Sequence, residues 1–393
     1  MSYGNSRVYL DHAATTPVDP EVVQAMLPYF GGGFGNPSSI YQSGQDAHAA
    51  LDRARSQVAG VLGSRTSEII FTSGATESIG MALRGAAWAA KLKQPDSTPH
   101  IVSTAVEHHA VLHTLDALER QGFRVTRVPC DAEGCAQAAD VVAAIESETC
   151  LVSVMLANNE VGTIQAVADI GAEVRSRGIL MHTDAVQAAG ALPIRVNDLN
   201  VDLLSLSAHK FYGPKGVGIL YVRKGTQLEW TQEGGGQESG RRGGTENVPL
   251  IAGLGEAISR AEYGREQYVA YTSELRDALW SAIEERVSDV SLNGPVSGEN
   301  RLSNNLNITI EGVQGETVLL SLDMMGIEAS AGSACTTGNS EPSHVLLAMG
   351  LNEEAARASL RLTVGRGNSH EEMIQTADAL AEVVTRIRTL AGR

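Results

Sequence analysis

Short apolar runs alternate with longer amphipathic stretches through the first two-thirds of the chain. The runs are rich in Val, Ile and Leu and are bounded by polar or glycine-containing segments, which is typical of buried strands. They predict strands at residues 68–72, 100–104, 124–129, 151–156, 179–183, 203–207 and 217–222. The stretches between them have helical periodicity and predict helices at residues 77–91, 110–121, 136–145 and 168–177.

This alternation predicts an α/β fold, in which a large domain contains a mostly parallel seven-stranded sheet covered by helices. A parallel pair of strands needs a crossover connection, usually a helix, and most of the predicted strands are separated by one. The connection between Ser207 and Val217 is too short for a crossover helix. One strand at that point is therefore expected to run antiparallel.

The pattern changes at about Pro249. The elements predicted after it are a long helix at residues 250–286, a strand at 304–310, and helices at 317–324 and 370–389. This order indicates a smaller α+β domain at the C-terminal end, joined to the first domain by a connecting helix. We expect residues 15–255 to form the large domain, and residues 1–14 together with 256–393 to form the small one.

Composition and charge exclude several classes of protein. The chain has 393 residues, and its formal net charge of −16 argues against nucleic-acid binding because the phosphate backbone would repel it. No apolar stretch approaches the roughly 18 residues that a membrane-spanning helix needs, and no secretory signal pattern is present at the N-terminus. Four cysteines are too few for a disulfide framework. We therefore expect a cytoplasmic enzyme.

Two strand ends carry candidate chemistry. Lys210 follows the predicted strand at 203–207, and Asp184 directly follows the one at 179–183. Ligands of α/β sheets bind beyond the carboxyl ends of the strands, where a desolvated lysine amine can form a Schiff base and a carboxylate can keep a pyridine nitrogen protonated. This pair is what pyridoxal phosphate chemistry requires. The alternatives are a surface lysine and an N-cap aspartate.

Two further segments are predicted to reach the same edge of the sheet. The turn that ends at Thr76 joins a strand to a helix, and the N–H groups of a helix N-terminus bind phosphate well. An N-cap followed by Glu77 as a first-turn acid is an equal alternative for this turn. His108 follows the predicted strand at 100–104, where it can stack on an aromatic ring or move protons. Its neighbour His109 is expected to face solvent.

Cys335 differs from the other cysteines. It is surrounded by small and polar residues, in the run Gly332-Ser333-Ala334-Cys335-Thr336-Thr337-Gly338. Because a free cysteine is usually buried, a cysteine in such a loop indicates a reactive thiol. Cys130, Cys135 and Cys150 lack the paired Cys or His residues of a zinc site, so no metal site is expected.

Taken together, these motifs resemble those of the cysteine desulfurases, in the class V aminotransferase branch of the fold type I pyridoxal-phosphate enzymes. The resemblance runs nearly end to end. The matching segments are Tyr9-Leu10-Asp11-His12-Ala13-Ala14-Thr15-Thr16, Gly35-Asn36-Pro37-Ser38-Ser39, Ser207-Ala208-His209-Lys210, Arg241-Arg242-Gly243-Gly244-Thr245 and Gly332-Ser333-Ala334-Cys335. The long loop from Cys335 to Glu341-Pro342-Ser343-His344 resembles group I of the family, the nitrogenase and iron–sulfur-cluster type.

The resemblance implies a role for each matching residue. Lys210 is the Schiff-base lysine, His108 the ring-stacking and proton-handling histidine, and Cys335 the thiol on a loop of the small domain that takes the substrate sulfur. The cofactor-binding residues are Asp184 at the ring nitrogen, Gln187 at the phenolic oxygen, and Ala75, Thr76, Ser207 and His209 at the phosphate, with Thr245 reaching the phosphate of the neighbouring subunit in a homodimer. The substrate-binding residues are Asn159 and Arg361, which hold the carboxylate, and Asn36 in the loop through which the substrate enters.

The implied reaction converts L-cysteine to L-alanine and leaves the sulfur on Cys335 as a persulfide. The sulfur then passes to an acceptor protein, such as an iron–sulfur scaffold, or to a small thiol. The family's housekeeping members carry a longer C-terminal tail, so the acceptor stays open. Two alternatives also stay open. Another class V pyridoxal enzyme, such as an aminotransferase, a selenocysteine lyase or a cysteine lyase, would not need Cys335. A non-enzymatic sulfur-carrier scaffold would not need Lys210, Asp184 and His108 together.

Overall fold

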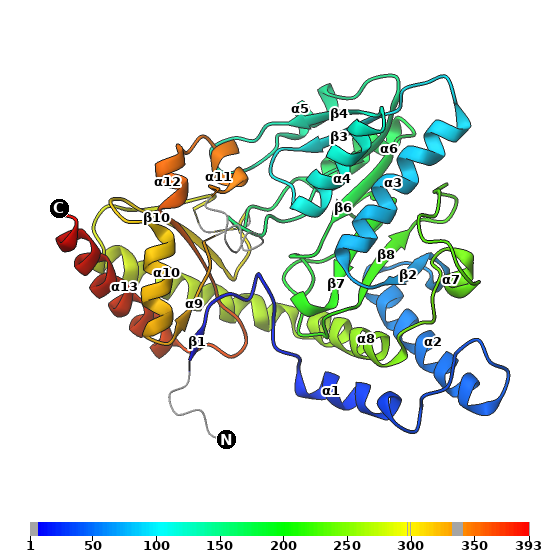
Figure 1. Ribbon diagram of the computed structural model, residues 1–393, viewed down its shortest axis with the longest axis horizontal. Coiled ribbons are helices and arrows are strands. Elements are labelled where there is room, and N and C mark those ends of the chain that lie inside the picture. Colours follow the sequence, from blue (N-terminus) through cyan, green and yellow to red (C-terminus); the bar gives the residue numbers. More distant parts are fainter. Residues whose placement is uncertain (1–6, 297, 299, 332–340, 393) are drawn as a thin grey trace.

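The computed structural model describes residues 7–296, 298, 300–331 and 341–392, and its two parts lie side by side (Figure 1). The strands are β1 (Val8–Tyr9), β2 (Ile69–Thr72), β3 (His100–Thr104), β4 (Arg124–Val128), β5 (Thr149–Ser153), β6 (Leu180–Asp184), β7 (Leu203–Ser207), β8 (Gly218–Val222), β9 (Val290–Leu292), β10 (Asn305–Ile310), β11 (Ile327–Glu328) and β12 (Ser359–Thr363). The α-helices are α1 (Pro20–Met26), α2 (Gln42–Leu62), α3 (Ala75–Lys93), α4 (His109–Arg120), α5 (Ala138–Ala143), α6 (Val167–Ser176), α7 (Gln237–Gly240), α8 (Val248–Tyr263), α9 (Arg265–Arg286), α10 (Gly315–Met324), α11 (His344–Ala348), α12 (Glu353–Arg357) and α13 (His370–Leu390). Short 3-10 segments are η1 (Leu27–Phe30), η2 (Thr66–Glu68) and η3 (Ala208–Lys210).

The larger part is built on a seven-stranded sheet in the order β2-β8-β7-β6-β5-β3-β4. Strands β7, β6, β5, β3 and β4 run parallel to one another. Strand β8 runs antiparallel to both β7 and β2. The predicted α/β fold with a mostly parallel sheet is therefore confirmed, and so is the one reversed strand after Ser207.

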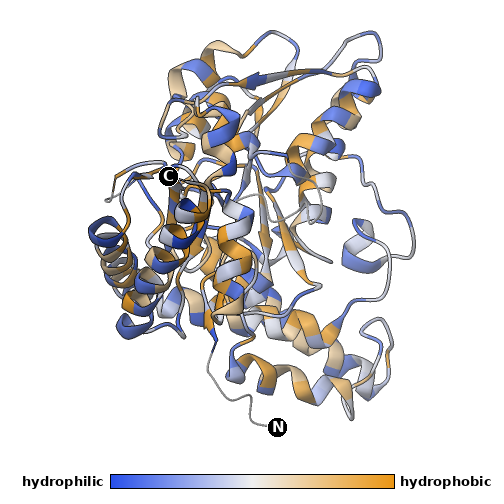
Figure 2. Cartoon of the chain, turned by 60° about the vertical axis from the view of Figure 1, so that its left-hand side comes forward, coloured by the Kyte–Doolittle hydropathy of each residue, from blue (hydrophilic) through white to orange (hydrophobic). Residues whose placement is uncertain are grey.

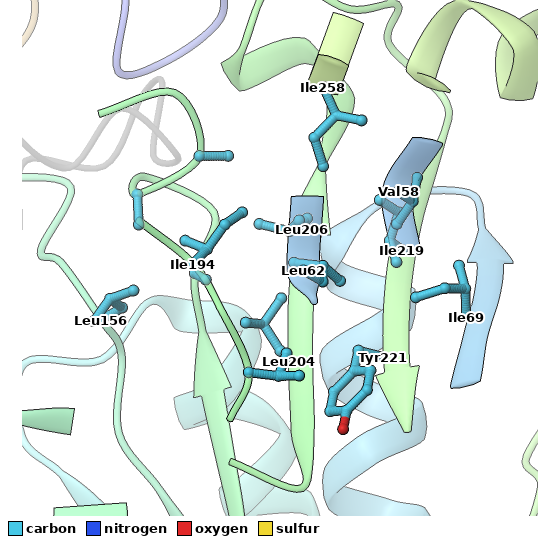
Figure 3. Close-up of a cluster of buried hydrophobic side chains, with 14 of the residues drawn as sticks. Val58, Leu62, Ile69, Leu156, Ile194, Leu204, Leu206, Ile219, Tyr221 and Ile258 are labelled. Atoms are coloured by element: carbon cyan, nitrogen blue, oxygen red, sulfur yellow. The ribbon is translucent and has the colours of Figure 1, made fainter. Parts of the chain in front are cut away.

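Apolar side chains alternate between the two faces of this sheet. Leu204 and Leu206 of β7 pack on one face with residues of α2 and α8, such as Leu62 and Ile258 (Figure 3). Leu203 belongs to the core on the opposite face, which α3 and α4 cover. Because successive strand residues point to opposite faces, one short apolar run supplies both cores. Much of the central sheet is orange in Figure 2, whereas the surrounding helices show orange and blue side by side.

The smaller part contains the antiparallel sheet β12-β10-β9, with α9, α10 and α13 packed around it. The N-terminal strand β1 pairs in parallel with β11, so the start of the chain lies in this part (Figure 1). Val8 and Leu10 share its apolar core with Leu275 of α9 and Val383 of α13. The division of the chain at residue 255 stays a prediction. Among the described residues, no helix is both long enough and apolar enough to cross a lipid bilayer.

The structure differs from the predicted elements in several places. The single long helix expected at residues 250–286 is two helices, α8 and α9, that meet at Gly264. Gly264 has φ −90° and ψ 4°, and glycine is a poor helix former, so the chain changes direction there. Helix α2 and strand β12 were not predicted. The buried face of α2 is made largely of Gly and Ala residues, which give a weak apolar pattern.

One close backbone approach shapes the edge of the sheet where the parallel strands end. Strand β8 begins at Gly218, directly beneath the turn that starts α3. A Cβ atom at Gly218 would lie 2.7 Å from the Cα atom of Gly74 and 2.7 Å from the carbonyl oxygen of Leu206. Because both neighbours are backbone atoms, neither can move aside cheaply. Glycine at 218 therefore lets β8 pass close to the start of α3.

Gly218→Ala should lower the free energy of unfolding by about 1–3 kcal/mol, because the added methyl group overpacks a backbone contact. The measurement is urea unfolding followed by circular dichroism. Gly80→Ala is the matched control, since Gly80 lies inside α3 with open space around its Cα atom and should gain up to about 1 kcal/mol. Equal stability of the two variants would contradict this account of the turn.

Candidate active site

A cavity of about 610 Å³ lies at the carboxyl ends of the parallel strands, and most of the predicted site residues line it. These residues are Ala75, Thr76, His108, Asn159, Asp184, Gln187, Ser207, His209, Lys210 and Arg361. They come from the last residues of β6 and β7, from the segments that follow β2, β3, β5, β6 and β7, and from β12 of the smaller part. The topology of the sheet therefore brings together side chains that lie far apart in the sequence.

Lys210 ends the 3-10 segment η3, immediately after β7. Its Nζ atom donates a hydrogen bond to the carbonyl oxygen of Ala14 at 2.8 Å and another to that of Ala13. The segment that contains these alanines is fixed in turn, because the Thr16 N–H donates to the carbonyl oxygen of His209 at 2.9 Å. The Lys210 amine is thus held at a defined place in the cavity wall.

Asp184 ends β6, the strand next to β7, and only 5% of its surface is exposed. Burial raises the pKa of its carboxyl group to about 6, although the Val186 N–H and the Lys210 cation each act to lower it. Oδ1 accepts the hydrogen bond from Val186 N at 2.9 Å. This bond closes a turn, and no helix begins in the described segment between β6 and β7, so the alternative of a helix N-cap at Asp184 is wrong. A buried carboxylate that lines the cavity is also suited to hold a cationic ring nitrogen.

His108 is the N-cap of α4, and its Nδ1 atom accepts a hydrogen bond from Ala110 N at 3.0 Å. The pKa of His108 is lowered to about 4, mainly by burial and in addition by the nearby Lys210 and the neighbouring histidines. The imidazole is therefore neutral at pH 7. His109 was expected to face solvent, but it lines the cavity and its ring stands 4.6 Å from that of His344. The side chains of α4 and α11 meet there, which turns His109 inward.

The start of α3 forms a cradle for an anion. Its N-cap is Gly74, which has φ 155° and no side chain to cap the first turn. The backbone N–H groups of Ala75 and Thr76 begin the helix at the cavity wall, and the dipole of α3 favours a negative charge there. A Cβ atom at Gly74 would lie 3.9 Å from the Ser207 hydroxyl group, so the two sides of the cradle are close. These residues fit a phosphate group.

Arg361 reaches the cavity from the smaller part. It lies on β12 and is only 2% exposed. Its guanidinium group donates to Asp11 Oδ1 at 2.7 Å and to the carbonyl oxygen of Asn159 at 3.1 Å. These contacts fix a planar cation beside Asn159, in a form that suits a carboxylate ligand.

Three predicted site residues do not appear in this group. Asn36 and Thr245 are described residues, but neither lines the cavity within one chain, and Asn36 is exposed. Cys335 lies outside the described residues. The described chain on each side of residues 332–340 is anchored near the cavity, since Ser330 pairs with the backbone of Arg361 and the Ser343 hydroxyl donates to Glu160.

Two acidic residues of the site were not assigned a role from the sequence. Asp11 is the partner of Arg361, and it lies in the opening motif that carries the family resemblance. Glu107 is fully buried next to His108, and it accepts hydrogen bonds from Met155 N at 2.9 Å and from the Thr104 hydroxyl at 2.8 Å. Burial raises the pKa of Glu107 to about 8. The only sign in the sequence that Glu107 belongs to the site was its position directly before His108.

Residues 8–373 match the family described as aminotransferase class-V. The chain therefore belongs to the aminotransferase class-V family. It is 46% identical over 387 residues to a cysteine desulfurase IscS of Clostridium botulinum, which covers 98% of this chain and 96% of that protein. It is also 46% identical over 391 residues to a cysteine desulfurase IscS of Methanosarcina thermophila, which covers 100% of this chain and 95% of that protein.

Solved structures of similar proteins agree with this family membership. A NifS-like protein superposes with a TM-score of 0.89 at 36% identity, over 97% of this chain and 100% of that one. A structure described as SspA in complex with cysteine superposes with a TM-score of 0.80 at 38% identity, over 92% of this chain and 99% of that one. The predicted resemblance to the cysteine desulfurases and the fold type I architecture are therefore confirmed.

In the cofactor-free protein at pH 8, Asp184→Asn should raise the free energy of unfolding by up to about 3 kcal/mol. The folded pKa of about 6 is above the ordinary value of 3.8, so the folded state binds this proton more tightly than the unfolded state does. The free energy of unfolding that a protonated Asp184 adds to the wild-type protein is fully present below about pH 4. It is lost as the pH rises through about 6. The advantage of the Asn variant should therefore shrink between pH 8 and pH 5, as measured by urea unfolding.

The control for this comparison is Asp46→Asn, on the exposed surface of α2, which should change stability little at either pH. An Asp184→Asn advantage that is equal at pH 5 and pH 8 would contradict the assignment of a buried, titrating carboxylate.

Proposed function

We propose that this protein is a pyridoxal-phosphate-dependent cysteine desulfurase that converts L-cysteine to L-alanine. The observation that carries the proposal is the amine of Lys210 beside the buried carboxylate of Asp184, at the ends of two neighbouring parallel strands. The relatives named cysteine desulfurase, which match nearly the whole chain at 46% identity, support it. The solved relative described in complex with cysteine supports cysteine as the substrate.

The cavity residues divide into those that hold the ring and those that hold the phosphate. In bound pyridoxal phosphate, Lys210 would hold the aldehyde and Asp184 would hold the ring nitrogen. Gln187 would bind the phenolic oxygen, and His108 would stack on the ring. The phosphate is held by Ala75, Thr76, Ser207 and His209. When bound, pyridoxal phosphate supplies an electron sink for the α-carbon of an amino acid. Asp184 sustains that sink because its buried carboxylate favours a protonated ring nitrogen.

Other residues position the substrate and move protons. Arg361 and Asn159 hold the carboxylate of cysteine, and Asp11 keeps the guanidinium group in place. Asn36 lies in the loop through which the substrate enters. His108 is neutral at pH 7 because burial lowers its pKa, and its Nδ1 atom is engaged by Ala110 N. Its Nε2 atom is therefore the position at which it exchanges a proton.

The sulfur transfer itself belongs to Cys335. Its thiolate attacks the substrate sulfur, so that the carbon–sulfur bond of cysteine breaks and a sulfur–sulfur bond forms. Cysteine and the Cys335 thiol together give alanine and a Cys335 persulfide, which needs no external oxidant or reductant. The persulfide sulfur then passes to an acceptor, for which we propose a protein of iron–sulfur cluster assembly or another sulfur-consuming pathway.

The assembly and location are also proposals. Thr245 and Asn36 lie away from the cavity of their own chain. A homodimer in which Thr245 reaches the phosphate of the partner subunit gives that residue a site, and a two-fold interface would complete two such sites at once. A cytoplasmic location fits the described Cys130, Cys135 and Cys150, which are free thiols.

Cys335→Ala should abolish the release of alanine and sulfide from cysteine, by at least about 100-fold, because alanine offers no thiolate. Pyridoxal phosphate binding should stay unchanged, since the residues that hold the cofactor are untouched. The measurement is alanine and sulfide release by the purified enzyme, together with a cofactor titration. Cys135→Ala is the control and should retain most activity, because its half-buried thiol lies outside the cavity.

Turnover of Cys335→Ala at the wild-type rate would refute the persulfide step and would favour another class V pyridoxal enzyme. A wild-type protein that binds pyridoxal phosphate but releases no alanine from cysteine would refute the desulfurase assignment.

A further inference from the structure

An acidic side chain lies beside the cradle assigned to the phosphate. Glu77 occupies the third position of α3, directly after Ala75 and Thr76, and lines the same cavity. Its Oε2 atom accepts a hydrogen bond from Ser73 N at 2.6 Å. Its side chain is only 17% exposed. The first turn of α3 therefore already carries a negative charge before any ligand binds.

Glu77 is ionised at neutral pH. Burial acts to raise the pKa of its carboxyl group, but the bonds from Arg242 and Ser73 outweigh burial and hold the pKa below its usual range. A carboxylate at a helix N-terminus is stabilised by the helix dipole. A phosphate at the same helix end would meet this charge at close range, and two like charges there repel each other.

Arg242 lies on the other side of Glu77 and pairs with it through two bonds. Its Nε atom donates to Glu77 Oε1 at 2.8 Å, and its Nη2 atom donates to Glu77 Oε2 at 3.2 Å. The Arg242 side chain is 19% exposed, so solvent screens this pair only in part. The hydrogen bond to Glu77, more than any other contact, raises the pKa of Arg242. The pair therefore carries no net charge beside the cradle.

The loop around Arg242 has anchors of its own. Arg241 donates to the carbonyl oxygens of Ser67 at 2.8 Å and Glu238 at 3.0 Å. The Gly243 N–H donates to the carbonyl oxygen of Gln232 at 3.1 Å. These bonds hold the loop without help from the Glu77 pair. A role of Arg242 in holding the loop would thus duplicate contacts that are already present.

We propose that Arg242 is a positioning residue for the phosphate group of the cofactor, and that it acts by neutralising Glu77. With Arg242 in place, the first turn of α3 can accept a dianionic phosphate. Without it, the uncompensated Glu77 carboxylate repels the phosphate and offsets the favourable dipole of α3. The proposal rests on pyridoxal phosphate being the ligand, as proposed above.

The test is a titration of four purified variants without cofactor, in which pyridoxal phosphate binding is followed by the absorbance of the bound chromophore. Arg242→Ala should weaken binding on the order of tenfold, which corresponds to about 1.4 kcal/mol. Glu77→Gln should bind within about twofold of wild type, because a glutamine can still accept from Ser73 N and carries no charge. The double variant Glu77→Gln with Arg242→Ala should recover to within about threefold of wild type. Arg241→Ala is the control, since it removes a loop anchor and leaves the Glu77 pair intact, and it should bind within about twofold of wild type.

A second probe separates the phosphate from the ring. Pyridoxal has the same ring and aldehyde but no phosphate group, so Arg242→Ala should bind pyridoxal as well as wild type does. A change in pyridoxal binding equal to the change in pyridoxal phosphate binding would contradict the proposal.

Three other results would overturn the inference and leave the proposed function intact. These are a double variant as weak as Arg242→Ala, a Glu77→Gln variant as weak as Arg242→Ala, and an Arg241→Ala variant as weak as Arg242→Ala. Each would assign Arg242 to loop structure in place of charge neutralisation. A wild-type protein that binds no pyridoxal phosphate would overturn the proposed function and this inference together.

Discussion

The buried carboxylate of Asp184 is the constraint on which the rest of the site depends. Burial of an anion is costly, and here it raises the pKa of Asp184 to about 6. Because a buried carboxylate is stabilised by a nearby positive charge, Asp184 favours a cationic group in the cavity. The parallel pairing of β6 with β7 places Lys210 at the next strand end, where the main-chain oxygens of Ala13 and Ala14 hold its amine. Together these groups fit the ligand proposed above, which has a basic ring and an aldehyde.

Both parts of the molecule contribute residues to this pocket. The larger part supplies the cradle at α3 and the residues at the strand ends. The smaller part supplies Arg361 from β12, and the N-terminal segment supplies Asp11 as its partner. Because the N-terminal strand β1 pairs with β11 of the smaller part, the segment that follows it crosses the cavity and contacts Lys210 on the way. A substrate carboxylate bound by Arg361, as proposed above, would therefore also connect the two parts.

The features that follow from local pattern were predictable, and those that follow from packing were not. Strands β3 and β7 match the predicted ranges because their apolar runs have sharp polar boundaries, and Lys210 and Asp184 follow from their places at strand ends. Strand β12 was missed because Arg361 interrupts its apolar pattern, and Arg361 entered only through the family resemblance. The pair between Glu77 and Arg242 joins residues 165 positions apart, so no local pattern could show it.

The central claim is that the Lys210 amine holds pyridoxal phosphate. Its most direct test is borohydride reduction of the purified protein with the cofactor, followed by digestion and mass spectrometry of the modified peptide. The account predicts a pyridoxyl group on Lys210 and none on Lys215, which lines the same cavity. Modification of Lys215 in its place, or no modification of either lysine in a protein that has bound the cofactor, would contradict it.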